Sequence, residues 1–232
     1  MEILVNVVGL LIILAVIYFR RKNKRELQEA TAAQQSAKDG VAADQYKLGT
    51  MYVKGQGVTK DYQEAVKWFR LAADQGEVNA QSALGLMYDN GEGVSKDDQE
   101  AINWYRLAGE QGDANAQYTL GLKYASGEGI DQDDKEAVKW FHLSVDNENF
   151  SAFQNLAEAY AEGKGVEKNL VEALKWYHLS AAVFDRRGSL GDWKTTMEGR
   201  THVSEQMSPS QIEESQNLAR EWQPASQREQ GK

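Results

Sequence analysis

The chain has 232 residues and a formal net charge of −9 at pH 7, with six tryptophans, two prolines and no cysteine. This length is enough for one elongated domain rather than two compact ones, and the lack of cysteine excludes disulfides and thiolate metal sites. Residues 1–25 carry five positive charges and Glu2, a net of +4, so residues 26–232 carry −9 − 4 = −13. That acidity argues against a nucleic-acid partner.

The chain begins with Ile3–Phe19, a run of 17 residues without charge. As a helix this run is about 25 Å long, the short end of a membrane span. A cleaved signal peptide would carry positive charge before the run and small residues at a cleavage site, whereas here only Glu2 precedes it. Residues 1–25 are therefore predicted to be a transmembrane anchor with a basic flank, which contacts the lipid bilayer through residues 3–19.

A basic cluster follows the run and consists of Arg20, Arg21, Lys22, Lys24 and Arg25. By the positive-inside rule it predicts a single-pass protein of a bacterial inner membrane with a cytoplasmic main domain, the periplasmic orientation being the alternative. Nucleic-acid binding is the weaker interpretation of the same cluster, because its position beside the run suits anionic lipid headgroups.

Residues 26–43 are rich in helix formers and contain no helix breaker before Gly40. A shift of 36 residues aligns Ala30, Ala33 and Ala37 with positions in the second helix of the unit that follows. The segment is predicted to be the second helix of a missing unit, which caps the repeats and can continue into the preceding helix.

Residues 44–184 repeat four times with a period of 36 residues. Leucine, tyrosine and tryptophan recur in register at Leu48, Leu84, Leu120 and Leu156, at Tyr52, Tyr88, Tyr124 and Tyr160, and at Trp68, Trp104, Trp140 and Trp176. A fixed period of this length predicts an all-α solenoid of stacked units. One tryptophan in each unit is expected to fill the space between layers.

Each unit is predicted to contain two helices, since Ala80, Leu84, Met87 and Tyr88 share one helical face. Glycine pairs follow at Gly55 and Gly57, Gly91 and Gly93, Gly127 and Gly129, and Gly163 and Gly165. The first of each pair suits a left-handed residue that ends the first helix. Capping boxes then predict the second-helix starts at Asp61 with Glu64, Asp97 with Glu100, Asp133 with Glu136, and Asn169 with Glu172.

At these residues the chain resembles the Sel-one-like repeat class, a relative of the tetratricopeptide repeats. The shared pattern is A-x-x-x-L-G-x-x-Y-x-x-G-x-G-V-x-x-D-x-x-x-A-x-x-W, which is complete at Ala80–Trp104 and at Ala116–Trp140 except for Ile130. The resemblance implies a right-handed superhelix that serves as an interaction scaffold. The third unit departs from the pattern, because Glu148 stands where the other units have Gly76 or Gly112, so stacking is expected to be least regular between the third and fourth units.

After the fourth unit the pattern fails, and residues 185–222 are predicted to form an atypical helical cap. Within the cap, Ser208-Pro209-Ser210-Gln211 has the features of a strong helix start. Residues 223–232 are polar and are predicted to be disordered.

The search for catalytic and metal motifs returns no site. The Gly-x-Gly turns recur with the repeat and precede acidic helix starts, which favours structural turns over phosphate loops. His142 and His178 are 36 residues apart and are interpreted as solvent-facing repeat positions, and His202 stands alone in the cap. Neither S-x-x-K nor S-D-N is present, so the chain lacks the nucleophile of enzymes that act on β-lactams or cell-wall substrates. We therefore expect no catalytic residues, metal or cofactor.

Recognition is predicted at first-helix positions that vary between units. By analogy with tetratricopeptide arrays, the predicted groove consists of the residues two before and two after each repeat leucine, namely Tyr46, Thr50, Ser82, Leu86, Tyr118, Leu122, Gln154 and Glu158. Aromatic and aliphatic side chains in an acidic solenoid suit a protein or peptide segment.

The sequence thus favours a membrane-anchored scaffold for protein–protein interaction. An inhibitor or immunity-type protein that blocks one effector enzyme is the alternative with the same architecture, and a cell-wall-related enzyme is the third hypothesis.

Overall fold

A computed structural model describes residues 2–187 and 190–228, and within these ranges the chain is helical and contains no β-strand. In chain order the helices are α1 (Glu2–Lys38), α2 (Ala42–Lys54), α3 (Tyr62–Ala73), α4 (Val78–Asn90), α5 (Asp98–Glu110), α6 (Ala114–Ser126), α7 (Asp134–Asp146), the 3-10 turn η1 (Phe150–Ala152), α8 (Phe153–Glu162), α9 (Leu170–Arg187), α10 (Leu190–Ser204), α11 (Pro209–Glu221) and α12 (Ala225–Arg228). The predicted all-α repeat architecture is confirmed.

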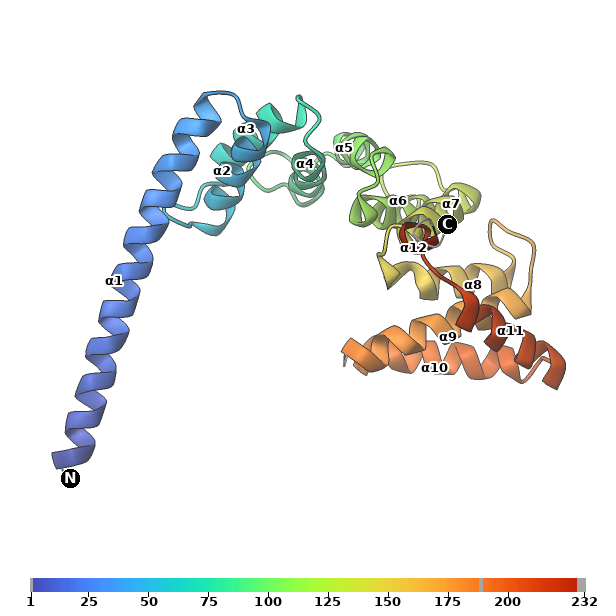
Figure 1. Ribbon diagram of the computed structural model, residues 1–232. Coiled ribbons are helices and arrows are strands. Elements are labelled where there is room, and N and C mark those ends of the chain that lie inside the picture. The colour runs from blue at the N-terminus through green and yellow to red at the C-terminus, as the bar shows by residue number, and fades with distance from the viewer. Residues whose placement is uncertain (1, 188–189, 229–232) are drawn as a thin grey trace. The chain divides into compact units, whose positions relative to one another are not determined.

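The chain divides into two compact units, Met1–Asp97 and Asp98–Lys232. Inside the first unit α1 packs on α2, α2 on α3, and α3 on α4 (Figure 1). Inside the second unit each helix from α5 to α9 packs on the next one, and α9 also contacts α11 and α10. Contact between neighbours in sequence is the packing expected of a solenoid.

The end of α1 occupies the place of a second helix. Ala30, Ala33 and Ala37 are buried, as predicted from the 36-residue shift. The carbonyl of Ala37 accepts a hydrogen bond of 3.1 Å from Gln45 Nε2, and in the same way the carbonyl of Ala73 accepts one of 3.3 Å from Gln81. Residues 26–38 therefore contact the first repeat as the second helix of a preceding unit would.

The helix α1 is continuous from Glu2 through the basic cluster to Lys38. Among the residues that the structure describes, no helix has the length and apolar character needed to cross a membrane. The predicted anchor at Ile3–Phe19 falls mostly on residues 1–16, whose side chains lie outside the described ones. The anchor stays a prediction.

The first glycine of each pair ends the first helix in the left-handed conformation, as predicted. Gly55, Gly91, Gly127 and Gly163 are C-cap residues with φ of 66°, 69°, 74° and 76°. Each amide donates to the carbonyl four residues earlier, which satisfies one of the free carbonyls at a helix end. The turns thus have a structural explanation.

The second glycine of each pair makes a contact that the sequence did not reveal. A Cβ added to Gly93 would lie 2.3 Å from the carbonyl oxygen of Tyr62, and one on Gly165 would lie 2.1 Å from that of Asp134. Both partner atoms belong to the first turn of the second helix in the preceding unit. A Cβ on Gly57 would likewise lie 2.2 Å from the carbonyl oxygen of Glu26 in α1. Only a residue without a side chain allows this approach of two backbones.

The second helices begin at the predicted residues, but the predicted capping box is only half formed. Asp61 accepts hydrogen bonds from the amides of Gln63 and Glu64, and Asp133 and Asn169 act equivalently. The glutamate does not bond back to the cap amide, because the amide of Asp61 already donates to the carbonyl of Tyr52 at 3.0 Å. Glu64 instead pairs with Lys67, three residues along the same helix.

The tryptophans are not equally buried, which corrects the expectation that each fills the space between layers. Trp140 and Trp176 are buried, with 6% and 3% of their surface exposed, whereas Trp68 and Trp104 are only partly buried. Trp176 gains its burial from the cap, since its ring lies 5.8 Å from that of Trp222.

The junction between the third and fourth units is the irregular one. Glu148 has φ of 70°, whereas the equivalent Gly40, Gly76 and Gly112 have φ of 89°, 86° and 93°. The 3-10 turn η1 then precedes α8, which has 10 residues instead of the 13 of α4 and α6. A missing glycine is therefore accommodated by a strained glutamate and a shorter first helix.

The C-terminal segment is helical, as predicted for the cap. Ser208 forms a complete capping box with Gln211, and Pro209 occupies the first turn of α11. Within the segment 223–232, for which disorder was predicted, α12 covers Ala225–Arg228. Residues 229–232 lie outside the described residues.

The two glycines of one turn allow a matched test of the contact between successive repeats, here the contact of Gly165 with Asp134. Gly163 and Gly165 have similar φ values of 76° and 71°, but a Cβ on Gly163 would make its nearest contact at 3.3 Å, with the Cβ of Lys168. We expect Gly163→Ala to lower the free energy of unfolding by about 1–2 kcal/mol through backbone strain. Gly165→Ala should cost about 1–3 kcal/mol more, because it also forces the backbones apart. Equal losses in urea titrations would show that the contact with Asp134 is unimportant.

Glu148 gives a stabilising prediction. Glu148→Gly removes the left-handed strain at the price of a more flexible unfolded chain, so we expect a gain of about 0.5–1 kcal/mol in the free energy of unfolding. Glu148→Ala is the control, because it removes the carboxylate while keeping the strain. A gain with alanine equal to that with glycine would mean that the charge, and not the backbone, destabilises the junction.

Candidate partner-binding surface

The two tyrosines of the predicted groove are partly packed against the core. The Tyr46 ring lies 5.7 Å from that of Phe69, and the Tyr118 ring lies 6.1 Å from that of Phe141. Both phenylalanines sit over a helical glycine, since a Cβ on Gly121 would lie 2.5 Å from Phe141. The expectation that these tyrosines are free of the core is wrong. Because glycine has no side chain, the phenylalanine ring can lie over it and beside the tyrosine ring.

The two leucines of the predicted groove are exposed. Leu86 has 48% and Leu122 has 37% of its surface accessible. Leu84 and Leu120, two residues before them, are fully buried. The first helices therefore present apolar side chains outside the core at the positions where the sequence placed them.

The polar groove positions differ in their contacts. Thr50 donates to the carbonyl of Tyr46 at 3.1 Å, and both residues line a pocket of about 280 Å³ with Glu26 and Glu29 of α1. Ser82 is partly buried on α4.

In the fourth repeat, the predicted groove residue Gln154 contacts the cap. Gln154 donates to Glu158 at 2.9 Å and accepts from Thr196 of α10 at 3.2 Å. Thr196 is fully buried and also lies 3.3 Å from the hydroxyl of Ser180. Gln154 is thus part of a polar network with the cap.

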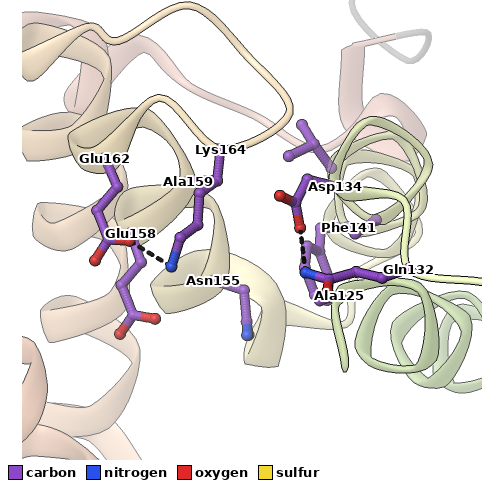
Figure 2. Close-up of a pocket in the computed structure, with 11 residues that line it drawn as sticks. Ala125, Gln132, Asp134, Phe141, Asn155, Glu158, Ala159, Glu162 and Lys164 are labelled. Atoms are coloured by element: carbon purple, nitrogen blue, oxygen red, sulfur yellow. Dashed lines mark hydrogen bonds and ion pairs between the residues drawn. The ribbon is translucent and has the colours of Figure 1, made fainter. Parts of the chain in front are cut away.

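A groove separates α6 and α7 from α8 (Figure 2). Its volume is about 170 Å³, and its floor includes the ring of Phe141 and the methyl group of Ala159. Glu158 lines the groove, as does Ala125, which lies one helical turn beyond Leu122. Of the predicted positions, Glu158 lines this groove and Leu122 does not.

The rim of this groove is polar. Glu162 pairs with Lys164 at 2.5 Å on one side, and Gln132 donates to Asp134 at 3.3 Å on the other (Figure 2). The charged residues that line the groove are Asp134, Glu158, Glu162 and Lys164. An apolar floor with a charged rim suits an inserted side chain of a protein partner.

Two ladders of polar contacts between successive helices went unnoticed in the sequence. Gln45, Gln81 and Gln117 are buried and donate to a carbonyl near the end of the preceding helix, the last of them at 2.8 Å to Gly109. Arg70 donates to the hydroxyl of Tyr88, and Arg106 donates to that of Tyr124 at 3.3 Å. The signal for both ladders was present, because each residue recurs with the 36-residue period.

The histidines at the arginine positions are not solvent-facing, which corrects their interpretation from the sequence. His142 is partly buried, and its Nε2 lies 3.3 Å from the hydroxyl of Tyr160. Burial, and then the charge of Lys175, lowers the pKa of His142. His178 is also partly buried, and burial followed by the charges of Arg200 and Arg220 lowers its pKa to about 4. His202 is exposed.

Comparison with known proteins agrees with this geometry. The crystal structure of c5321, a protective antigen of uropathogenic Escherichia coli with an SLR fold, is 41% identical over 66% of this chain, with a TM-score of 0.64. This chain covers 33% of that antigen. The crystal structure of a Sel1 repeat protein from Oxalobacter formigenes is 28% identical, with a TM-score of 0.67 and coverage of 85% of this chain and 86% of that one. No curated protein sequence matches the chain.

The match to a family is direct. The sequence model of the Sel1 repeat matches residues 42–77, 78–113, 114–149 and 154–182, which is more than half of the chain. The four matched segments contain the turns, caps and ladders described above. The chain therefore belongs to the Sel1 repeat family.

Proposed function

We propose that the protein is a membrane-anchored scaffold that holds a protein partner at the inner face of a bacterial membrane. The Sel1 repeat architecture is suited to protein–protein interaction. The observation that carries the proposal is the exposure of Leu86 and Leu122 beside the fully buried Leu84 and Leu120. An exposed apolar side chain at a position that the core does not use is available to a partner.

The expected partner is an extended or helical protein segment with apolar anchors. The groove beside α8 has an apolar floor and a rim that carries Asp134, Glu158 and Glu162. Anchors that insert into such a groove supply affinity, and basic residues around them would complement the rim.

An inhibitor or immunity-type role is the alternative, and the same architecture would serve it. Affinity capture from detergent-solubilised membranes discriminates between the two. A scaffold should recover several partners, whereas recovery of one toxic enzyme would favour the inhibitor. A cell-wall-related enzyme is the third hypothesis, and the sequence contains neither the S-x-x-K nor the S-D-N motif that would support it.

The exposed leucines test the proposed surface. Leu86→Ala with Leu122→Ala should weaken partner capture at least tenfold, which corresponds to about 1.4 kcal/mol. The free energy of unfolding should change by only about 0.5 kcal/mol or less, since both side chains are exposed.

Tyr118→Ala is the matched comparison for this experiment. Because its ring packs beside Phe141, we expect a loss of stability as well as any loss of capture. Unchanged capture by the double leucine variant would place the binding surface elsewhere.

The membrane part of the proposal rests on Ile3–Phe19 and on the five positive charges that follow it. By the positive-inside rule, a protease added to intact spheroplasts should leave residues 40–222 uncut. Lysis of the same spheroplasts is the control and should expose these residues to cleavage. Digestion before lysis would reverse the orientation, and a mature protein that begins after Tyr18 would remove the anchor.

A further inference from the structure

A further pocket lies where the last repeat helix meets the cap. The helix α9 packs against α11 and α10 (Figure 1). Residues of these three helices line an open pocket of about 350 Å³. Its lining residues are His178, Leu179, Ala182, Arg200, Gln216, Ala219 and Arg220. The pocket shares no residue with the groove beside α8.

The charge of this pocket is opposite to that of the chain. Two arginines and a histidine line it and no carboxylate does, although the chain as a whole carries −9. Arg200 donates to the sulfur of Met197 at 3.8 Å. Arg220 donates to the side-chain oxygen of Asn217 at 2.9 Å. Among the described residues, neither guanidinium forms an ion pair.

His178 has a ring nitrogen that no protein group contacts by a hydrogen bond among the described residues. This atom, Nε2, is buried. Both arginines face it closely enough for their charges to lower its pKa, after the larger effect of burial. Two guanidinium groups near each other repel, and a buried nitrogen without a hydrogen-bond partner costs free energy. An anion bound among them would reduce both costs.

We propose that this pocket binds a phosphate group, held by Arg200, Arg220 and His178. A dianion matches the two guanidinium charges, and arginine donates two parallel hydrogen bonds to such oxyanions. The methyl groups of Leu179, Ala182 and Ala219 leave an apolar wall, which suits a phosphate monoester on a short apolar stem. This inference stands apart from the proposed groove, because the two sites use different residues.

The test is a titration of the full chain in a maltoside detergent with inorganic phosphate at constant ionic strength. Ring signals of the three histidines are followed by NMR, and His142 and His202 serve as internal references. We expect a saturable shift of the His178 signals alone. The pKa of His178 should rise from about 4 when phosphate is bound, because the anion stabilises the imidazolium and offsets the two arginine charges.

Substitutions complete the test. Arg220→Gln, at an exposed position, should weaken phosphate binding at least tenfold, and Arg200→Gln should do the same. Arg106→Gln is the matched control in the repeats and should leave binding unchanged, since Arg106 contacts Tyr124. Circular dichroism verifies that each variant is folded.

Three results would overturn the inference. A linear shift shared by all three histidines would show only a general salt effect. If the folded Arg220→Gln variant bound phosphate with unchanged affinity, Arg220 would not be a phosphate ligand and the assignment would be wrong. Acetate that binds as tightly as phosphate would make the site a carboxylate site. Partner capture through Leu86 and Leu122 is measured in a separate experiment. A failure of the proposed function is therefore distinguishable from a failure of phosphate binding.

Discussion

The stack depends on one backbone contact, the approach of the second turn glycine to the first turn of the preceding unit's second helix. The contact occurs at Gly57, Gly93, Gly129 and Gly165, and at three of these four the nearest atom is a carbonyl oxygen. A side chain at any of these positions would meet atoms at 2.1 to 2.4 Å. The first glycine of each pair shapes its own turn, whereas the second sets the distance between units.

The same contact connects the repeats to α1. Gly57 meets Glu26 as Gly93 meets Tyr62, and Gln45 bonds Ala37 as Gln81 bonds Ala73. The residues that directly follow the basic cluster are therefore structural parts of the first repeat. Because α1 is continuous, an anchor at its start would be joined to the repeats without a flexible linker.

The sequence was sufficient for those features that depend on local chemistry. Left-handed glycines, helix starts at Asp61 and Asp133, and the Ser208 capping box follow from residue type and spacing alone. Features that depend on a neighbouring helix were missed. Glu64 has the spacing of a capping box, but the competing acceptor for the cap amide is Tyr52, which belongs to the preceding helix. Equal spacing likewise could not show that only Trp140 and Trp176 become buried.

The candidate surface was predictable to a similar degree. Variation between units correctly marked Leu86 and Leu122 as exposed, since no core position requires them. It failed for Tyr46 and Tyr118, because the glycine that brings a phenylalanine beside each tyrosine lies three residues further along the helix. The pocket beside the cap could not be predicted, because it forms where α9 of the fourth repeat meets α10 and α11, which follow no repeat.

The end of the repeat explains why that pocket exists. Arg70, Arg106 and His142 each contact a tyrosine of the next first helix, and a fifth unit would place that tyrosine at position 196. Thr196 stands there instead and bonds to Ser180 and Gln154, so His178 has no tyrosine hydroxyl to contact. The cap therefore seals the apolar core with Trp222 but leaves the last member of the polar ladder without its partner. Arg200 and Arg220 surround this position with positive charge, so an anion can complete the ladder where a tyrosine would end it.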